Sequence, residues 1–188
     1  MPSPLEPFYL EAQRALAALG GQEPSSEAWL RAVLAKTLVL VAVSYFDAEV
    51  TAGLRAAFRR CLAKDMLLPL ALNKAVEMQF HSLFNWRKPD FERFLGQFGG
   101  RFQNEIKRAL WDSRAPEPGG PPRLDPFEAF ISIGALRNQL AHLDFAAYPV
   151  DKTLDEVHEM AQRADLFLRI MLAELERCGP PAGGAPTS

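Results

Sequence analysis

The stretch Glu27–Lys64 constrains the fold more than any other part of this chain, because it contains no proline and a single glycine, Gly53. Proline breaks helix interiors and glycine weakens them, so a stretch of this length predicts one long helix. Ser25 or Ser26 is placed to cap its first turn. Because a helix this long is rarely straight, we expect a break or kink within Asp47–Gly53.

The rest of the sequence also indicates helices separated by short turns. Glycine pairs and prolines delimit further expected helices over residues 5–19, 67–84, 90–98 and 101–113, from about 125, and over 153–177. Thr153 and Glu156 have the spacing of a capping box at the start of the last one. No convincing strand pattern of alternating apolar residues is present. We therefore predict an all-α fold, a helical bundle with short additional helices.

The composition is that of one ordinary globular domain. With 48% apolar and 23% charged residues in a chain of 188, one well-filled core is expected. We predict a single domain over residues 1–178 and a disordered, low-complexity tail over 179–188. The formal net charge of −2 gives no overall attraction to nucleic acid, so RNA binding would need a local basic cluster.

The sequence shows no signature of a metal site, of secretion or of a membrane span. Cys61 and Cys178 are too few and too far apart for a zinc site or a disulfide framework. The N-terminus has no basic segment leading into an apolar run, and the most apolar stretch, residues 38–46, is far shorter than the roughly 20 residues that a span needs. We predict a cytoplasmic protein without a membrane span, a metal or a cofactor.

The segment "ALRNQLAH", Ala135–His142, is the strongest candidate for chemistry. Arg137 and Asn138 are adjacent, and His142 follows four residues after Asn138 in a chain with three histidines. With 15 arginines among 188 residues, roughly a quarter of such an arginine–histidine match is expected by chance. The spacing alone therefore does not establish a site.

The helical wheel of this segment separates the motif from the expected core. The predicted core stripe consists of Ile133, Leu136, Leu140 and Leu143. Asn138 and His142 lie together on roughly the opposite side. Ile131 and Phe145 fall on that same far side, where exposed apolar groups are unfavourable, so we expect a second subunit to cover them.

The other two histidines are expected to have structural or solvent-exposed roles. His81, in "MQFHSLF", has no acid, base or nucleophile beside it in sequence, so we expect it to be packed or capping. His158, in "DEVHEM", lies on a polar helix face and is expected to be solvated.

The segment Arg137–His142 resembles the signature of HEPN ribonucleases, in which an arginine, a polar residue and a histidine lie late in an all-helical domain. Three other segments are similar to the RiboL-PSP subgroup of that family: "VSYFDAEV" (43–50), "LFNWRKPDFERFLGQFGGRFQNEI" (83–106) and "KTLDEVHEMAQRADLFLRIM" (152–171). The resemblance covers roughly residues 38–175. One departure is Leu143, which stands where members of the subgroup usually have glycine.

The resemblance implies a metal-independent endoribonuclease that acts as a homodimer with a composite site. Arg137 and His142 would be catalytic, and Asn138 would orient the imidazole or bind phosphate. Asp47 would be the supporting acidic residue, with Glu49 as the alternative. Family members suggest a bacterial toxin or anti-phage effector, restrained by an antitoxin or another defence-system partner.

Two questions stay open at this level. Arg101, Lys107 and Arg108, with the nearby Arg114 and Arg123, could form the RNA-binding surface, or each could be a solvated side chain. The alternatives to a nuclease are a non-catalytic HEPN module that binds a nucleotide or a protein, and a structural dimerisation domain with an accidental motif.

Overall fold

The computed structural model describes residues 3–19, 24–62, 68–76, 83–84, 86, 91–113, 124–142, 145 and 148–177. Their helices are α1 (Leu5–Leu19), α2 (Pro24–Leu62), α3 (Leu68–Ala75), α5 (Phe91–Gly96), α6 (Gly100–Ser113), α7 (Pro126–His142) and α8 (Leu154–Arg177). No strand is present among these residues. The predicted all-α fold is confirmed.

Helix α2 runs without a break through all of its 39 residues, so the predicted long helix is confirmed and a break within Asp47–Gly53 is ruled out. The reason lies in packing between helices. A Cβ added to Gly53 would lie 2.3 Å from Cδ2 of Leu172, a residue of α8. Gly53 is therefore a place where α8 approaches α2 closely.

Local signals set the start of two helices. α2 begins at Pro24, because proline is favoured in the first turn of a helix, and Ser25 and Ser26 lie inside the helix instead of capping it. The capping box of α8 is confirmed: the N–H of Thr153 donates to Oε2 of Glu156 at 2.7 Å, and the N–H of Glu156 donates to Oγ1 of Thr153 at 3.2 Å.

The helix expected over residues 67–84 ends earlier than predicted. α3 ends at Ala75, and Val76 lies in a turn with its side chain buried. Residues 77–82 lie outside the described part of the chain, as do most of the proline-rich loop and the tail predicted to be disordered. The expected helices over 5–19, 90–98, 101–113 and 153–177 match α1, α5, α6 and α8 to within about two residues.

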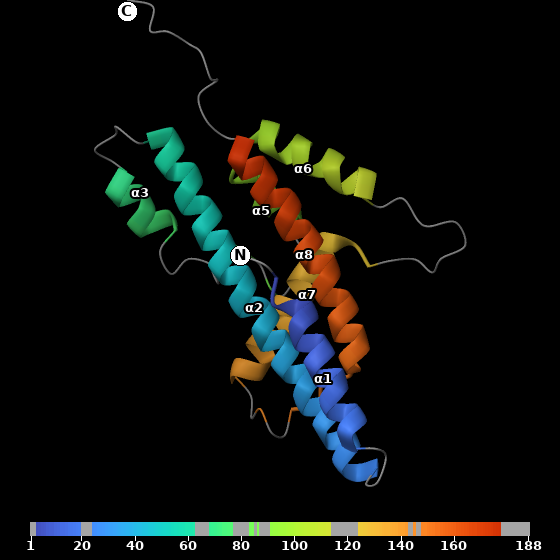
Figure 1. Ribbon diagram of the computed structural model, residues 1–188. Helices are drawn as coiled ribbons and strands as arrows, with labels where there is room; N and C mark the ends of the chain where they lie inside the picture. The colour runs from blue at the N-terminus through green and yellow to red at the C-terminus, as the bar shows by residue number, and fades with distance from the viewer. Residues whose placement is uncertain are drawn as a thin grey trace, which may run out of the picture.

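Helices α2, α7 and α8 form the centre of the bundle (Figure 1). Phe46 of α2, Phe130 of α7 and Phe167 of α8 meet there, with ring centroids 5.3 Å apart for Phe46–Phe130 and 5.2 Å for Phe130–Phe167. α1 folds back along α2 and touches α8, and α6 lies across the end of α8 (Figure 1). The core thus joins residues from the whole length of the described chain.

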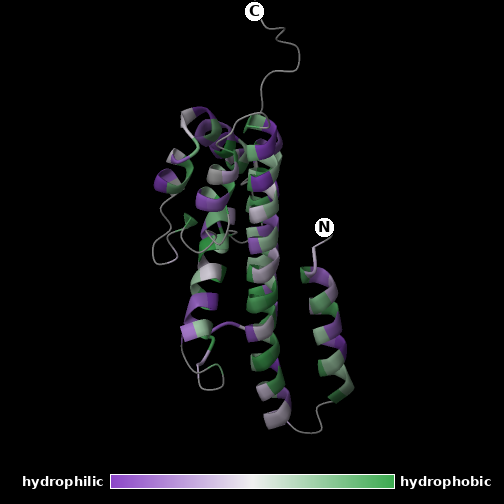
Figure 2. Ribbon diagram, turned by 90° about the vertical axis from the view of Figure 1, so that its left-hand side faces the viewer, coloured by the Kyte–Doolittle hydropathy of each residue, from purple (hydrophilic) through white to green (hydrophobic). Residues whose placement is uncertain are grey.

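Helix α2 is long and apolar enough to cross a membrane by length and composition, and it is the single described helix that meets this criterion. Figure 2 shows the hydrophobic residues gathered in the half of α2 beside α1. The core helix of a soluble bundle meets the same criterion, and 39% of the most apolar window of α2 is buried inside the molecule. The finding is weak evidence for a span, and the absence of a membrane role stays a prediction.

Candidate functional site

Helix α7, which carries the segment Ala135–His142, starts deep inside the bundle. Oδ1 of Asp125 caps it by accepting hydrogen bonds from the N–H groups of Phe127 (3.0 Å) and Glu128 (3.2 Å). The first half of the helix is buried on most sides, and Ile131 is 3% exposed. The expectation that a second subunit must cover Ile131 is therefore wrong, because the chain's own core covers it.

An aromatic cluster covers α7 just before the motif. Trp86 is 9% exposed and packs with Phe84 and Phe130, at centroid distances of 5.1 and 5.9 Å. A Cβ added to Gly134 would lie 2.0 Å from ring atoms of Trp86. Only glycine lets the indole lie against α7 here, one turn before Arg137.

The motif occupies the half of α7 that emerges from this cover. Arg137 and Asn138 are half-buried, and Nη1 of Arg137 donates to Oδ1 of Asn138 at 3.3 Å. His142 is the last residue of the helix and is exposed. Arg137 and His142 are five residues apart, which turns their side chains about 140° from each other and separates them by ~7.5 Å along the axis. The two side chains thus leave the helix in different directions, and the Arg137 guanidinium bends toward Asn138, which lies on the same side of the helix as His142.

The structure does not bring Asp47 to the motif. Oδ1 of Asp47 accepts a hydrogen bond from Oγ1 of Thr51 at 3.2 Å, within α2. Its neighbour Phe46 packs against Phe130, which precedes Arg137 by seven residues, or ~10 Å of helix. Within the described residues, Asp47 contacts neither Arg137 nor His142. Glu49 lies near Tyr45, on the side of α2 that faces α8.

The three predicted RNA-binding residues lie at the other end of the molecule. Arg101 and Arg108 border a cavity of about 380 Å³ at the C-terminal end of α8, whereas α7 ends beside the start of α8 (Figure 1). Two of the three cations are paired: Nζ of Lys107 lies 2.6 Å from Oε1 of Glu92, and Arg108 pairs with Glu105. Within one subunit they do not form a common surface with His142.

Two described residues of the segment that follows α7, Phe145 and Tyr148, form hydrogen bonds with helices α2 and α7. Nζ of Lys36, from α2, donates to the carbonyl oxygen of Phe145 at 2.7 Å. The hydroxyl of Tyr148 donates to Oε1 of Gln139 at 2.6 Å. In the sequence, Lys36 lies two residues before the apolar stretch 38–46, and nothing there indicates a buried contact. The structure shows that the Lys36 side chain is buried, with 6% of its surface exposed, which the sequence does not predict.

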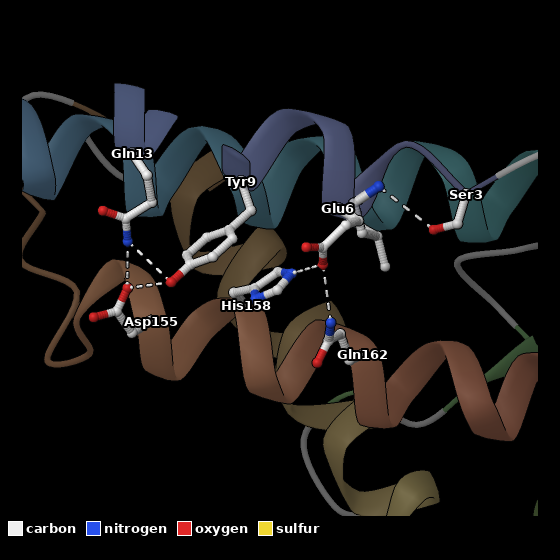
Figure 3. Close-up of polar contacts among 8 residues, drawn as sticks. Ser3, Glu6, Tyr9, Gln13, Asp155, His158 and Gln162 are labelled. Atoms are coloured by element: carbon white, nitrogen blue, oxygen red, sulfur yellow. Dashed lines mark hydrogen bonds and ion pairs between the residues drawn. The ribbon is translucent and has the colours of Figure 1, made fainter. Parts of the chain in front are cut away.

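A polar cluster joins α1 to α8 (Figure 3). Oδ1 of Asp155 accepts hydrogen bonds from the Tyr9 hydroxyl at 2.8 Å and from Nε2 of Gln13 at 2.7 Å. The ring of His158 stacks on Tyr9 at a centroid distance of 3.8 Å, and its Nε2 lies 3.0 Å from Oε2 of Glu6, without the alignment of a hydrogen bond. His158 is 8% exposed, so the expectation that it is solvated is wrong.

A second polar cluster, which includes the buried Asp165, lies between α2 and α8. Burial and the nearby carboxylate of Asp165 raise the pKa of Tyr45 to about 12. Nε of Arg169 donates to Oδ2 of Asp165 at 2.8 Å, which partly compensates that buried charge. Neither this cluster nor the one at α1 includes a motif residue, and both join helices to each other.

Several residues named in the sequence analysis lie outside the described part of the chain: His81, Leu143, Arg114, Arg123 and Cys178. Within that part, no group of three or more His, Cys, Asp or Glu side chains is arranged to hold a metal ion. No family model, no curated protein and no solved structure matches this chain. The resemblance to HEPN ribonucleases therefore rests on the sequence segments themselves.

Proposed function

We propose that this protein is a metal-independent endoribonuclease of the HEPN type, with Arg137 and His142 as catalytic residues. The observation that carries the proposal is the position of the motif at the emerging end of α7. Its polar residues are half-buried or exposed there, and the same helix is fully packed one turn earlier. This position leaves the Arg137 and His142 side chains accessible to a substrate, as a catalytic role requires.

The chemistry follows from the residue types. In RNA cleavage the 2′-hydroxyl attacks the adjacent phosphorus, which needs a group to accept and return protons and a group to stabilise the extra negative charge. An imidazole transfers protons near neutral pH, and a guanidinium donates two parallel hydrogen bonds to phosphate oxygens. The products would be a 2′,3′-cyclic phosphate and a 5′-hydroxyl. Asn138 would keep the Arg137 guanidinium in place through their hydrogen bond.

The diverging directions of Arg137 and His142 favour a composite site. The two side chains leave the helix about 140° apart, and within the described residues no hydrogen bond or ion pair joins Arg137 to His142. Two copies of α7 meeting at their exposed ends would bring the arginine of one toward the histidine of the other. We therefore propose that a homodimer is the active form.

Single-site variants test the proposed catalytic residues. Purified protein in EDTA should cleave single-stranded RNA, and both Arg137→Ala and His142→Ala should lose at least 10²-fold of the rate, the usual contribution of such groups. His158→Ala is a matched control, since it removes a histidine that is buried between α1 and α8. Equal rates for wild type and His142→Ala would refute the assignment.

The second candidate function is a non-catalytic HEPN module that binds a nucleotide or a protein at the same end of α7. The hydrogen bond of Arg137 to Asn138, with no contact to His142 within one subunit, is the observation that favours it. Saturable binding of a short RNA or a mononucleotide, weakened by Arg137→Ala and without cleavage, would identify this function. The role as a cytoplasmic toxin or anti-phage effector, with a protein that restrains it, belongs to the first proposal.

A further inference from the structure

Lys36 is the most deeply buried lysine among the described residues, and nothing in the proposed chemistry accounts for it. It is 6% exposed and lies on the face of α2 that also buries Ala35, Val39 and Val43. Removing an ammonium group from water is costly, and an aliphatic side chain would pack at this position without that cost. A lysine here needs a contact that only a cation supplies.

Lys36 makes two contacts with Phe145, which lies in the segment directly after the motif. Nζ of Lys36 donates to the carbonyl oxygen of Phe145 at 2.7 Å and stands 5.3 Å from the centroid of the Phe145 ring. Both are favourable for a cation, since the carbonyl oxygen and the ring face each carry negative charge. Phe145 is three residues beyond His142, so Lys36 attaches α2 to the backbone next to the proposed catalytic histidine.

A second attachment lies on the other side of His142. The Tyr148 hydroxyl bonds to Gln139, which precedes His142 by three residues, and this fastens the connecting segment back onto α7. That bond joins two neighbouring parts of the chain and lets them move together. Of these two attachments, the one from Lys36 connects the segment after α7 to α2, and so to the core of the bundle.

We propose that Lys36 is a positioning residue that fixes the last turn of α7, and with it the imidazole of His142. The inference rests on the proposed function for its catalytic meaning, and its structural content can be tested separately. Without the ammonium, the connecting segment loses its attachment to α2 and the last helical turn can fray. His142 then occupies several orientations, and a displacement of about 1 Å is enough to cost 10²-fold in rate.

Histidine NMR tests the structural content without any activity. The chain has three histidines, so a ¹³C–¹H spectrum of the imidazole groups shows three Cε1–H signals, and His142→Gln and His158→Gln assign two of them. In Lys36→Met we expect the His142 signal to shift and broaden, while the His158 signal stays in place. Arg60→Met is the matched control, because Arg60 also bonds from α2 to a backbone carbonyl, that of Leu175 at the far end of the bundle.

Kinetics tests the catalytic meaning. Lys36→Met should lower kcat about 10- to 100-fold with KM changed by less than about twofold, and Lys36→Arg should recover part of the loss because a guanidinium can still donate to Phe145. An unchanged His142 signal, or an equal shift of the His142 and His158 signals, would overturn the inference even if RNA is cleaved. If wild type cleaves no RNA but the His142 signal shifts alone, the proposed function fails and the positioning role stands. Should Lys36→Met fail to fold, Lys36→Gln, whose amide is too short to reach the carbonyl, replaces it in the same comparison.

Discussion

Gly134 and Gly53 both let a neighbouring side chain come close to a helix, but their neighbours differ in how far they can yield. A Cβ at Gly134 would lie 2.0 Å from the buried, rigid indole of Trp86. A Cβ at Gly53 would meet the end of the flexible Leu172 side chain at 2.3 Å. The cost of filling each space should follow that difference.

We predict that Gly134→Ala lowers the free energy of unfolding by at least the 1–3 kcal/mol typical of overpacked cores. Gly53→Ala should cost less, since Leu172 can change rotamer, and alanine also favours the helix. Gly96→Ala, with nothing within 4 Å of the added Cβ, is the control and should be nearly neutral. Urea denaturation of the three variants gives the order, and a Gly134→Ala protein as stable as wild type would contradict the contact with Trp86.

Tyr45 gives a prediction for alkaline pH. Its pKa is raised from 10.0 to about 12 in the folded protein, so folding favours the neutral phenol. The stability that this phenol contributes is fully present below pH 10 and is lost as the pH rises toward 12. The urea midpoint of wild type should therefore exceed that of Tyr45→Phe at pH 8, and the difference should shrink between pH 10 and 12. A difference that stays constant over this range would contradict the assigned environment.

Single residues also show where the sequence is insufficient. His158 stands among charged residues in sequence, yet it is buried, because Tyr9 and Glu6 arrive from a helix about 150 residues away. Lys36 likewise became informative only through Phe145, more than 100 residues distant. The pattern around a residue predicts its helix, whereas contacts across the fold decide its burial.

At the scale of elements, helix ends with a local signal were predictable. The capping box at Thr153 predicts the start of α8 correctly, because both partners are within four residues. The role of Gly53 within α2 was not predictable, because it depends on the contact with Leu172 of α8. The place where α3 ends was missed because a continuous apolar pattern does not distinguish a helix from a buried turn at Val76.

The cap of α8 can be measured. Thr153→Ala removes the hydroxyl that accepts from the N–H of Glu156, and the usual cost of losing such a cap is about 1 kcal/mol. Glu159→Ala, at an exposed position of the same helix, should change stability by less than half of that. Thermal unfolding followed by circular dichroism compares the two. Equal stability of Thr153→Ala and Glu159→Ala would show that the cap contributes nothing.

For the whole molecule, the composite site predicts a dimer. In the proposed composite site, the Arg137 of one chain acts with the His142 of a second copy, so the exposed end of α7 is incomplete alone. Light scattering during size-exclusion chromatography should give twice the 20.9 kDa of one chain at the concentrations used for cleavage. Full activity from a monomer would contradict the composite site. In the proposed nuclease, Arg101 and Arg108 would bind RNA only if the RNA extends along the bundle, because they lie near the C-terminal end of α8.

The most direct measurement is the chemistry of the cleaved ends. End-labelled RNA incubated with the protein in EDTA should yield 2′,3′-cyclic phosphate and 5′-hydroxyl termini, and the same RNA with a 2′-deoxy sugar at the cleavage position should stay intact. His142→Ala, prepared in parallel, should give neither product. Cleavage that requires a divalent metal, that leaves 3′-hydroxyl and 5′-phosphate termini, or that persists in His142→Ala would contradict the proposed nuclease.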